Sequence, residues 1–150
     1  IPYAHKDITL SAVGYVYAIL GILVEELGFV PKNKQEYSNY LLQKMLVYIE
    51  DHFREDLLIS DVAKYCGYHK DYLSKIFNAN VGCGFNRYVN LLRVRYAKKL
   101  IAQEKLSLDE ICSESGFQSM ISFRRAFTDY YGQSPYQYSC SLKIKDEKET

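Results

Sequence analysis

Part of this chain occurs twice, about fifty residues apart. The segment VAKYCGY at 62–68 aligns with ICSESGF at 111–117, an offset of 49 residues. The second copy then has one extra residue, and four further positions match at an offset of 50: Leu73, Phe77, Gly82 and Tyr88 with Phe123, Phe127, Gly132 and Tyr138. Two copies are too few to bury the continuous core of a solenoid. The sequence therefore predicts two copies of one helical module.

Each copy has the residue pattern of a helix-turn-helix. Two helices that cross at about 90–120° approach closely, so a small side chain is needed at the crossing and glycine is favoured in the sharp turn. Both copies meet these needs with an aliphatic residue, a small residue and a glycine: Val62, Ala63 and Gly67 in the first, Ile111, Cys112 and Gly116 in the second.

Apolar residues recur three and four positions apart along most of the chain, and strand-like alternation is absent. This pattern predicts an all-α fold: two helix-turn-helix subdomains joined by a long linker helix, plus an N-terminal helix. PKNKQE is expected to be a linker, and the polar residues 141–150 a flexible tail. The predicted helices span 9–27, 37–53, 59–66, 71–80, 85–103, 108–115 and 121–131, with a last turn near 135–139.

The second copy begins with a capping box, in which the Ser107 hydroxyl and the Glu110 carboxylate satisfy free backbone N–H groups. Leu58 stands at the matching position of the first copy. That helix loses a side-chain cap worth about 1 kcal/mol unless Asp56 or Ser60 begins it instead.

Composition excludes several classes of protein. A net charge of +1 over 150 residues gives no overall signal for nucleic acid. The apolar stretch at 12–24 is shorter than a membrane span, and the start at Ile1 without a signal peptide indicates a piece of a longer chain. The cysteines at 66, 83, 112 and 140 lack metal-ligand spacing. Reduced thiols in a cytoplasmic protein are expected, with no metal, cofactor or membrane partner, and no motif suggests an enzyme.

Charge is nevertheless uneven along the chain. Residues 64–99 contain eight cations and one anion, whereas residues 100–140 contain three cations and five anions. If the partner is nucleic acid, the first copy and the linker helix should supply most of the affinity, and binding should weaken strongly with salt.

The chain from about 37 to 139 resembles the DNA-binding domain of the AraC/XylS family of bacterial transcriptional regulators. The motifs that carry the resemblance are DVAKYCGYHKDYLSKIF, YVNLLRVRYAKKLI and DEICSESGFQSMISFRRAFTDYYGQSPYQY. It implies a two-lobed domain whose recognition helices enter successive major grooves on one face of DNA. The implied organisation is a helical remnant of a sensor and dimerisation domain at 1–33, a DNA-binding domain at 34–140 and the tail. Within the domain lie helix-turn-helix units at about 58–80 and 107–131, and the linker helix at about 85–103.

The same resemblance implies which residues touch DNA. The base-facing positions fall on Asp71, Ser74 and Lys75 in the first recognition helix, and on Met120, Ile121, Ser122 and Arg125 in the second. Cationic side chains match the O6 and N7 acceptors of guanine, which favours Lys75 and Arg125, whereas the two apolar residues suit thymine methyl groups. Phosphate contacts are expected from His69, Lys70, Arg87, Lys98, Ser119 and Arg124.

Simpler roles compete at several of these positions. Lys98 and Lys99 also fit the solvated face of the linker helix, and His69 fits a solvated turn. Arg93 is as well suited to bracing the two lobes as to binding DNA. Where many family members have an arginine after the tyrosine of the last motif, Ser139 stands here.

These observations predict a sequence-specific DNA-binding regulator, an activator, with double-stranded DNA and RNA polymerase as partners. A homodimer through the N-terminal helix, a small-molecule effector bound by a missing N-terminal domain, and control of carbohydrate genes follow from the resemblance alone. The alternative is a helical protein-interaction module without DNA affinity, and a cysteine-dependent enzyme has little support.

Overall fold

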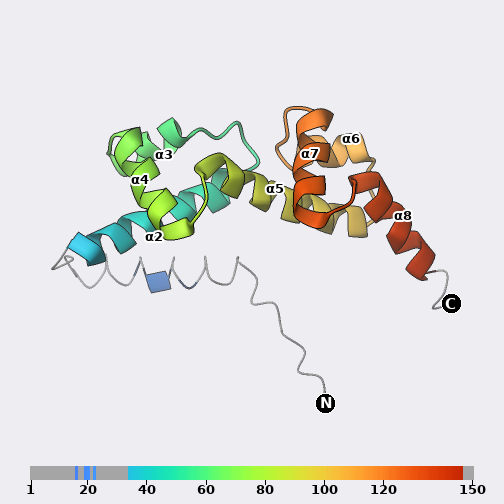
Figure 1. The fold of residues 1–150 in the computed structure, drawn as a ribbon, viewed down its shortest axis with the longest axis horizontal. Helices are drawn as coiled ribbons and strands as arrows, with labels where there is room; N and C mark the ends of the chain where they lie inside the picture. Colours follow the sequence, from blue (N-terminus) through green and yellow to red (C-terminus); the bar gives the residue numbers. More distant parts are fainter. Residues whose placement is uncertain (1–15, 17–18, 21, 23–33, 147–150) are drawn as a thin grey trace, which may run out of the picture. The chain divides into compact units, whose positions relative to one another are not determined.

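The computed structural model describes residues 16, 19, 20, 22 and 34–146. In this part of the chain the regular structure is entirely helical, as predicted (Figure 1). The helices are α2 (Lys34–His52), α3 (Ile59–Cys66), α4 (Lys70–Val81), α5 (Phe85–Ala102), α6 (Leu108–Glu114), α7 (Met120–Tyr131) and α8 (Pro135–Asp146).

Most of the helix predicted at 9–27 lies outside the described residues. Within that range the described residues are Val16, Ile19, Leu20 and Ile22, and all are helical and exposed. The dimerisation role assigned to this segment stays a prediction.

Two predicted boundaries are wrong. The segment PKNKQE is not a linker throughout, because α2 already begins at Lys34; Lys, Gln and Glu are all good helix formers. The final helix does not stop near 139 but continues to Asp146, so residues 141–146 are not a flexible tail. Leu142 explains the extension, since it packs against the apolar core of the second half of the chain.

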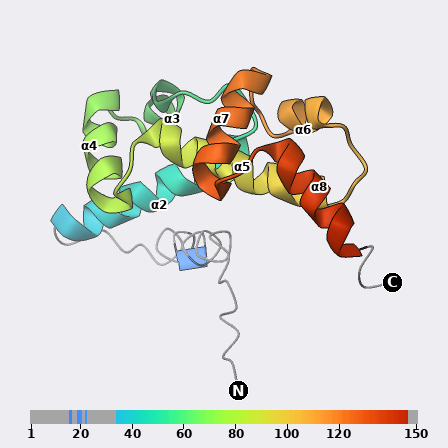
Figure 2. The ribbon, with the colours of Figure 1, turned by 45° about the vertical axis from the view of Figure 1, so that its right-hand side comes forward.

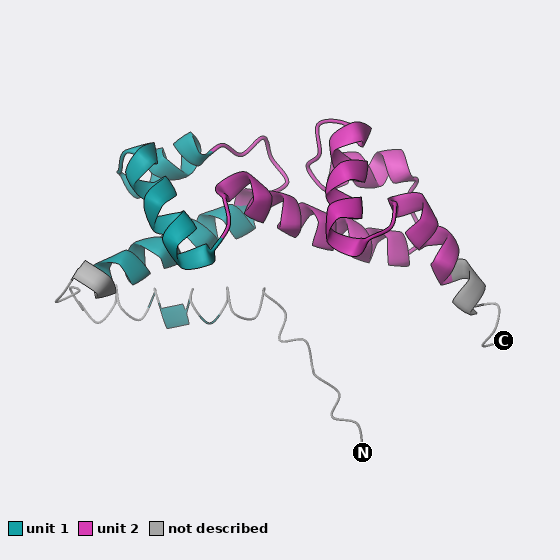
Figure 3. Ribbon diagram, viewed as in Figure 1, with its two compact units in different colours: residues 1–51, 59–82 teal, residues 52–58, 83–150 magenta. Residues whose placement is uncertain are grey.

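The chain divides into two compact units (Figure 3). The first comprises residues 1–51 and 59–82 and contains α2, α3 and α4. The second comprises residues 52–58 and 83–150 and contains α5 to α8. The predicted linker helix, which is α5, is thus part of the second unit.

In the first unit, α3 and α4 form a helix-turn-helix that lies on one side of α2 (Figures 1 and 2). Tyr48 of α2 stacks on Tyr65 of α3, with ring centroids 4.4 Å apart. The buried residues of these helices are Leu41, Met45, Ile49, Val62, Ala63, Cys66, Leu73, Ile76 and Phe77.

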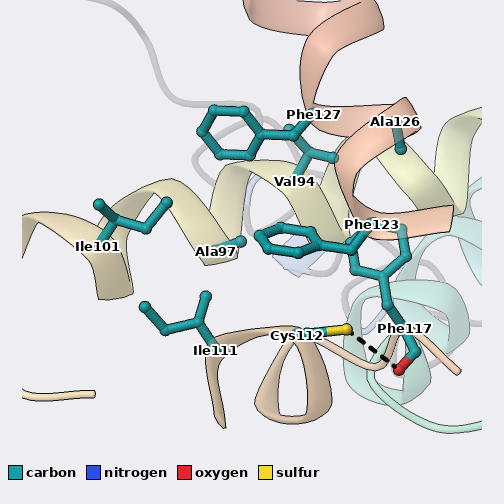
Figure 4. Close-up of a cluster of buried hydrophobic side chains, with 9 residues drawn as sticks. All are labelled: Val94, Ala97, Ile101, Ile111, Cys112, Phe117, Phe123, Ala126 and Phe127. Atoms are coloured by element: carbon teal, nitrogen blue, oxygen red, sulfur yellow. Dashed lines mark hydrogen bonds between the residues drawn. The ribbon is translucent and has the colours of Figure 1, made fainter. Parts of the chain in front are cut away.

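In the second unit, α6, α7 and α8 all pack against α5. Figure 4 shows the core that they share, where Phe123 and Phe127 of α7 point toward Val94 and Ala97 of α5. Burial of the aromatic and aliphatic side chains of such a cluster is the main source of stability for a small helical unit.

The sequence repeat is a structural repeat. The turns between α3 and α4 and between α6 and α7 contain Gly67 and Gly116, with φ of 77° and 83°, which a side chain disfavours. Helices α4 and α7 have 12 residues each, and both the first and the last residue of α7 lie 50 positions after those of α4. The predicted capping box at Ser107 and Glu110 is confirmed. Leu58 directly precedes α3, which begins at Ile59 rather than at Asp56 or Ser60.

Residues 52–58, called the crossing segment below, are fixed to α5 by Arg93. The Nε and NH2 groups of Arg93 donate to the carbonyl oxygens of Phe53 and Glu55, both at 2.7 Å. Burial lowers the pKa of this guanidinium. Arg93 therefore braces a backbone segment of its own unit, and bracing between the two lobes stays a prediction.

Candidate nucleic-acid interface

Helix α4 presents one polar face to solvent, because its apolar residues Leu73, Ile76 and Phe77 are buried on the other. Asp71 and Lys75 are exposed on the outer face. Of the remaining predicted contact residues of this helix, Lys70 is exposed and Ser74 is half-buried. A major groove accepts a helix, so an outer face of this kind is suited to reading base edges.

Helix α7 has the same design, with Phe123, Ala126 and Phe127 buried. Its outer face contains Ile121, which is 82% exposed, together with the predicted contact residues Ser122, Arg124 and Arg125. Met120 is half-buried, as Ser74 is, and its side chain packs against the core of the second unit.

The first turns of both helices are capped by side chains that were assigned to phosphate. His69 caps α4, its Nδ1 accepting from the Asp71 N–H at 3.5 Å and lying 3.3 Å from the Asp71 carboxylate. Ser119 caps α7, its Oγ accepting from the Ser122 N–H at 3.2 Å. The Ser122 hydroxyl in turn donates to the Ser119 carbonyl at 2.8 Å.

Tyr72 was not among the predicted contact residues. It is 42% exposed and occupies, 50 residues earlier, the position of Ser122. Its ring lies 5.7 Å from that of Tyr68, and the Tyr68 hydroxyl is hydrogen-bonded to the Tyr37 hydroxyl, a bond that raises the pKa of Tyr68. Tyr72 stands 50 residues before Ser122, a predicted base-facing residue, and this offset is the signal in the sequence that identifies it.

Three of the eight cations between 64 and 99 have partners within the protein. Arg93 holds the crossing segment, Lys64 pairs with Asp61 at 3.6 Å, and Lys98 lies over the rings of Tyr131 and Tyr138 at 4.7 and 5.7 Å. The phosphate role predicted for Lys98 therefore competes with a cation–π interaction. The other five cations are exposed: Lys70, Lys75, Arg87, Arg95 and Lys99.

Other kinds of site have little basis in the described part of the chain. No group of three or more histidines, cysteines or acidic residues there is arranged to hold a metal ion. Burial raises the pKa of both the Cys66 and the Cys112 thiols, which disfavours the reactive thiolate. None of the described helices combines the length and apolarity needed to cross a membrane.

Comparison with known proteins assigns the fold to a family. A family model described as a helix-turn-helix domain matches residues 62–140. The chain belongs to the AraC-type helix-turn-helix family. The matched residues of this AraC-type domain run from α3 to α8 and so include both helix-turn-helix units.

Individual relatives agree with this assignment. An uncharacterised HTH-type transcriptional regulator of Staphylococcus aureus is 31% identical over 124 residues, which cover 80% of this chain and 17% of that protein. The Msm operon regulatory protein of Streptococcus mutans is 28% identical over 144 residues, which cover 92% of this chain and 51% of that protein. This chain thus spans about a sixth and about half of the two relatives.

A solved structure shows the same architecture. The C-terminal domain of AraT, a response regulator from Geobacillus stearothermophilus, is 27% identical and superposes with a TM-score of 0.64, covering 67% of this chain and 84% of that domain. Family and fold are those of transcriptional regulators rather than of enzymes.

Proposed function

We propose that this chain is the sequence-specific DNA-binding part of a bacterial transcriptional regulator, and that α4 and α7 insert their outer faces into successive major grooves. The observation that carries the proposal is the equivalence of the two helices. Each follows a glycine turn, buries an apolar face and exposes a cation at the same position, Lys75 in one and Arg125 in the other. A duplicated unit of this kind matches a ligand that itself repeats, such as the DNA helix.

Lys75 and Arg125 are the proposed guanine contacts. Both are exposed, and Arg125 offers two parallel donors to O6 and N7 of one guanine. Asp71 is suited to accept from the N4 amino group of cytosine, while its place in the first turn of α4 is also favoured by the helix dipole.

Phosphate contacts are proposed from three exposed cations, namely Lys70 of α4, Arg87 of α5 and Arg124 of α7. Free backbone N–H groups at the starts of helices add to them. His69 and Ser119 serve mainly as caps that hold the first turns of α4 and α7 in place.

The test uses a duplex selected by this 150-residue chain from a random library, with a scrambled duplex as competitor. At fixed salt, Lys75→Ala and Arg125→Ala should each lower affinity for the selected duplex by about 1–3 kcal/mol and hardly change affinity for the scrambled one. Lys105→Ala is the matched control, because Lys105 is exposed between α5 and α6 and belongs to neither α4 nor α7, whose outer faces are called the reading faces below. Equal affinity of the parent for both duplexes overturns the proposal and favours the protein-interaction alternative.

Nuclease footprinting provides the second measurement. Two major-groove turns correspond to a protected region of about 17–20 bp. Protection confined to one turn would contradict insertion of both helices.

The regulatory role is proposed from the relatives. Similarity to the Msm operon regulatory protein supports regulation of an operon. Activation, carbohydrate genes as targets, RNA polymerase as partner, a small-molecule effector, a homodimer and action in the cytoplasm are proposed from the family resemblance alone. A reporter downstream of the selected site should be induced by the intact regulator and lose induction with Arg125→Ala; unchanged induction would contradict this role.

A further inference from the structure

Ile121 is unusual among the apolar residues of the described chain. It is 82% exposed, more than any other large hydrophobic side chain there, and it lies on the outer face of α7 in the first turn. At the equivalent position of the first copy, 50 residues earlier, the chain has Asp71. The two reading faces therefore differ most sharply at this position.

The neighbours of Ile121 leave few hydrogen-bond donors in the first turn of α7. Met120 packs against the core of the second unit. The Ser122 hydroxyl lies 2.8 Å from the Ser119 carbonyl oxygen and 3.0 Å from the Ser119 Oγ, so it is engaged within the cap. An amide-like readout of adenine is thus missing, and the first turn offers a base edge chiefly an apolar surface.

Arg125 lies one helical turn beyond Ile121 on the same face and is also exposed. Residues four apart on a helix have Cβ atoms about 5–6 Å from each other. Successive base pairs are about 3.4 Å apart, so these two side chains reach base pairs one or two steps apart.

From this arrangement we infer that α7 reads a thymine through its C5 methyl group, packed on Ile121, one or two base pairs from the guanine bound by Arg125. The inference rests on the proposed function and specifies the half-site for α7. The first turn of α4, which has Asp71 in the equivalent place, has no such preference. A thymine methyl is the one apolar group that an unmodified base pair exposes in the major groove.

The test replaces each thymine of the selected duplex by deoxyuridine, which removes the methyl group and keeps every hydrogen bond. The half-site of α7 is located first. It contains the guanine whose substitution lowers the affinity of the parent chain but not that of Arg125→Ala. Uracil at the thymine beside that guanine should weaken binding of the parent chain about three- to fivefold, the effect of exposing one methyl group. Uracil in the other half-site should change affinity less than twofold.

Ile121→Ala supplies the decisive variant, since an exposed position tolerates alanine without loss of folding. This variant should bind the thymine and uracil duplexes equally, whereas Asp71→Ala should keep the full difference. Cytosine and 5-methylcytosine at the same position should differ by a similar factor for the parent chain.

Three outcomes would overturn the inference: selected sites without thymine beside that guanine, no uracil effect in the parent, or an uracil effect that persists in Ile121→Ala. Each leaves sequence-specific binding intact. Failure of the proposed function is a different result, in which no sequence is selected at all.

Discussion

Replacing Gly116 with alanine is predicted to destabilise the second unit far more than the same change at Gly132. Both glycines belong to this unit and have positive φ, 83° and 71°. They differ in their surroundings. A Cβ at Gly132 would meet nothing within 4 Å, whereas one at Gly116 would lie 2.5 Å from the Arg54 carbonyl oxygen and 2.6 Å from its Cα.

The expected magnitudes follow from this difference. At Gly132, alanine suffers the strain of the left-handed conformation, about 1–2 kcal/mol, partly offset by a less flexible unfolded chain. At Gly116 the backbone of Arg54 must in addition retreat by roughly 1 Å to restore a normal contact. That movement pulls the Phe53 and Glu55 carbonyls away from Arg93, and hydrogen bonds to a charged group contribute about 1.5–3 kcal/mol each. With both hydrogen bonds lost, Gly116→Ala should therefore cost about 4–8 kcal/mol.

Urea unfolding followed by far-ultraviolet circular dichroism measures both variants against the parent. The free energy of unfolding should fall at least about 2 kcal/mol further in Gly116→Ala than in Gly132→Ala, by the hydrogen-bond loss given above. Losses that agree within about 0.5 kcal/mol, the usual scatter of surface substitutions, would refute the close approach of Arg54 as the reason for glycine here.

Three further predictions concern single side chains. Arg93→Lys should lower the free energy of unfolding by about 1.5–3 kcal/mol, because one ammonium group does not span the Phe53 and Glu55 carbonyls; an unchanged urea midpoint would contradict this. Hydrogen bonds from Ser107 lower the pKa of Glu110 below its ordinary 4.5. The ionised Glu110 therefore stabilises the fold above pH 4.5, and this stabilisation is lost as the pH falls through the lowered pKa. Glu110→Gln keeps the capping box and should flatten this acid dependence in thermal melts at pH 3–6, and a variant as acid-sensitive as the parent would disprove it. Arg87→Gln should reduce the slope of log affinity against log salt by about 1, whereas Lys105→Gln should leave it unchanged; equal slopes for the two would remove Arg87 from the phosphate contacts.

Local chemistry explains why most helix boundaries were predictable. The αL turns at Gly67 and Gly116 and the capping box at Ser107 are encoded within a few residues of the turn they form. The start of α2 at Lys34 was misjudged although its local sequence favours a helix, and the end of α8 was misjudged because a contact with residues distant in the chain decides it. Leu142 lies in a polar stretch, yet its packing on the second core extends α8 past the point where its own sequence suggests a tail.

For the reading faces, the sequence predicted which side chains are exposed but not which of them are engaged in hydrogen bonds within the protein. The family resemblance predicted outward-facing positions for Lys75 and Arg125, and both are exposed, because burial of one helix face leaves the other to solvent. It did not separate Ser122, whose hydroxyl is used in a cap, from Ile121, which is free to make contacts. Hydrogen-bond competition of this kind depends on side-chain rotamers that a residue pattern does not specify.

By itself, the sequence determined the all-helical fold and the duplicated helix-turn-helix, because periodicity and turn chemistry are local properties. Only the tertiary structure decided that Arg93 holds the Phe53 and Glu55 carbonyls and that Lys98 lies on Tyr131. These pairs are about 30–40 positions apart in the chain, and the packing of whole helices brings them together, which residue spacing alone does not encode.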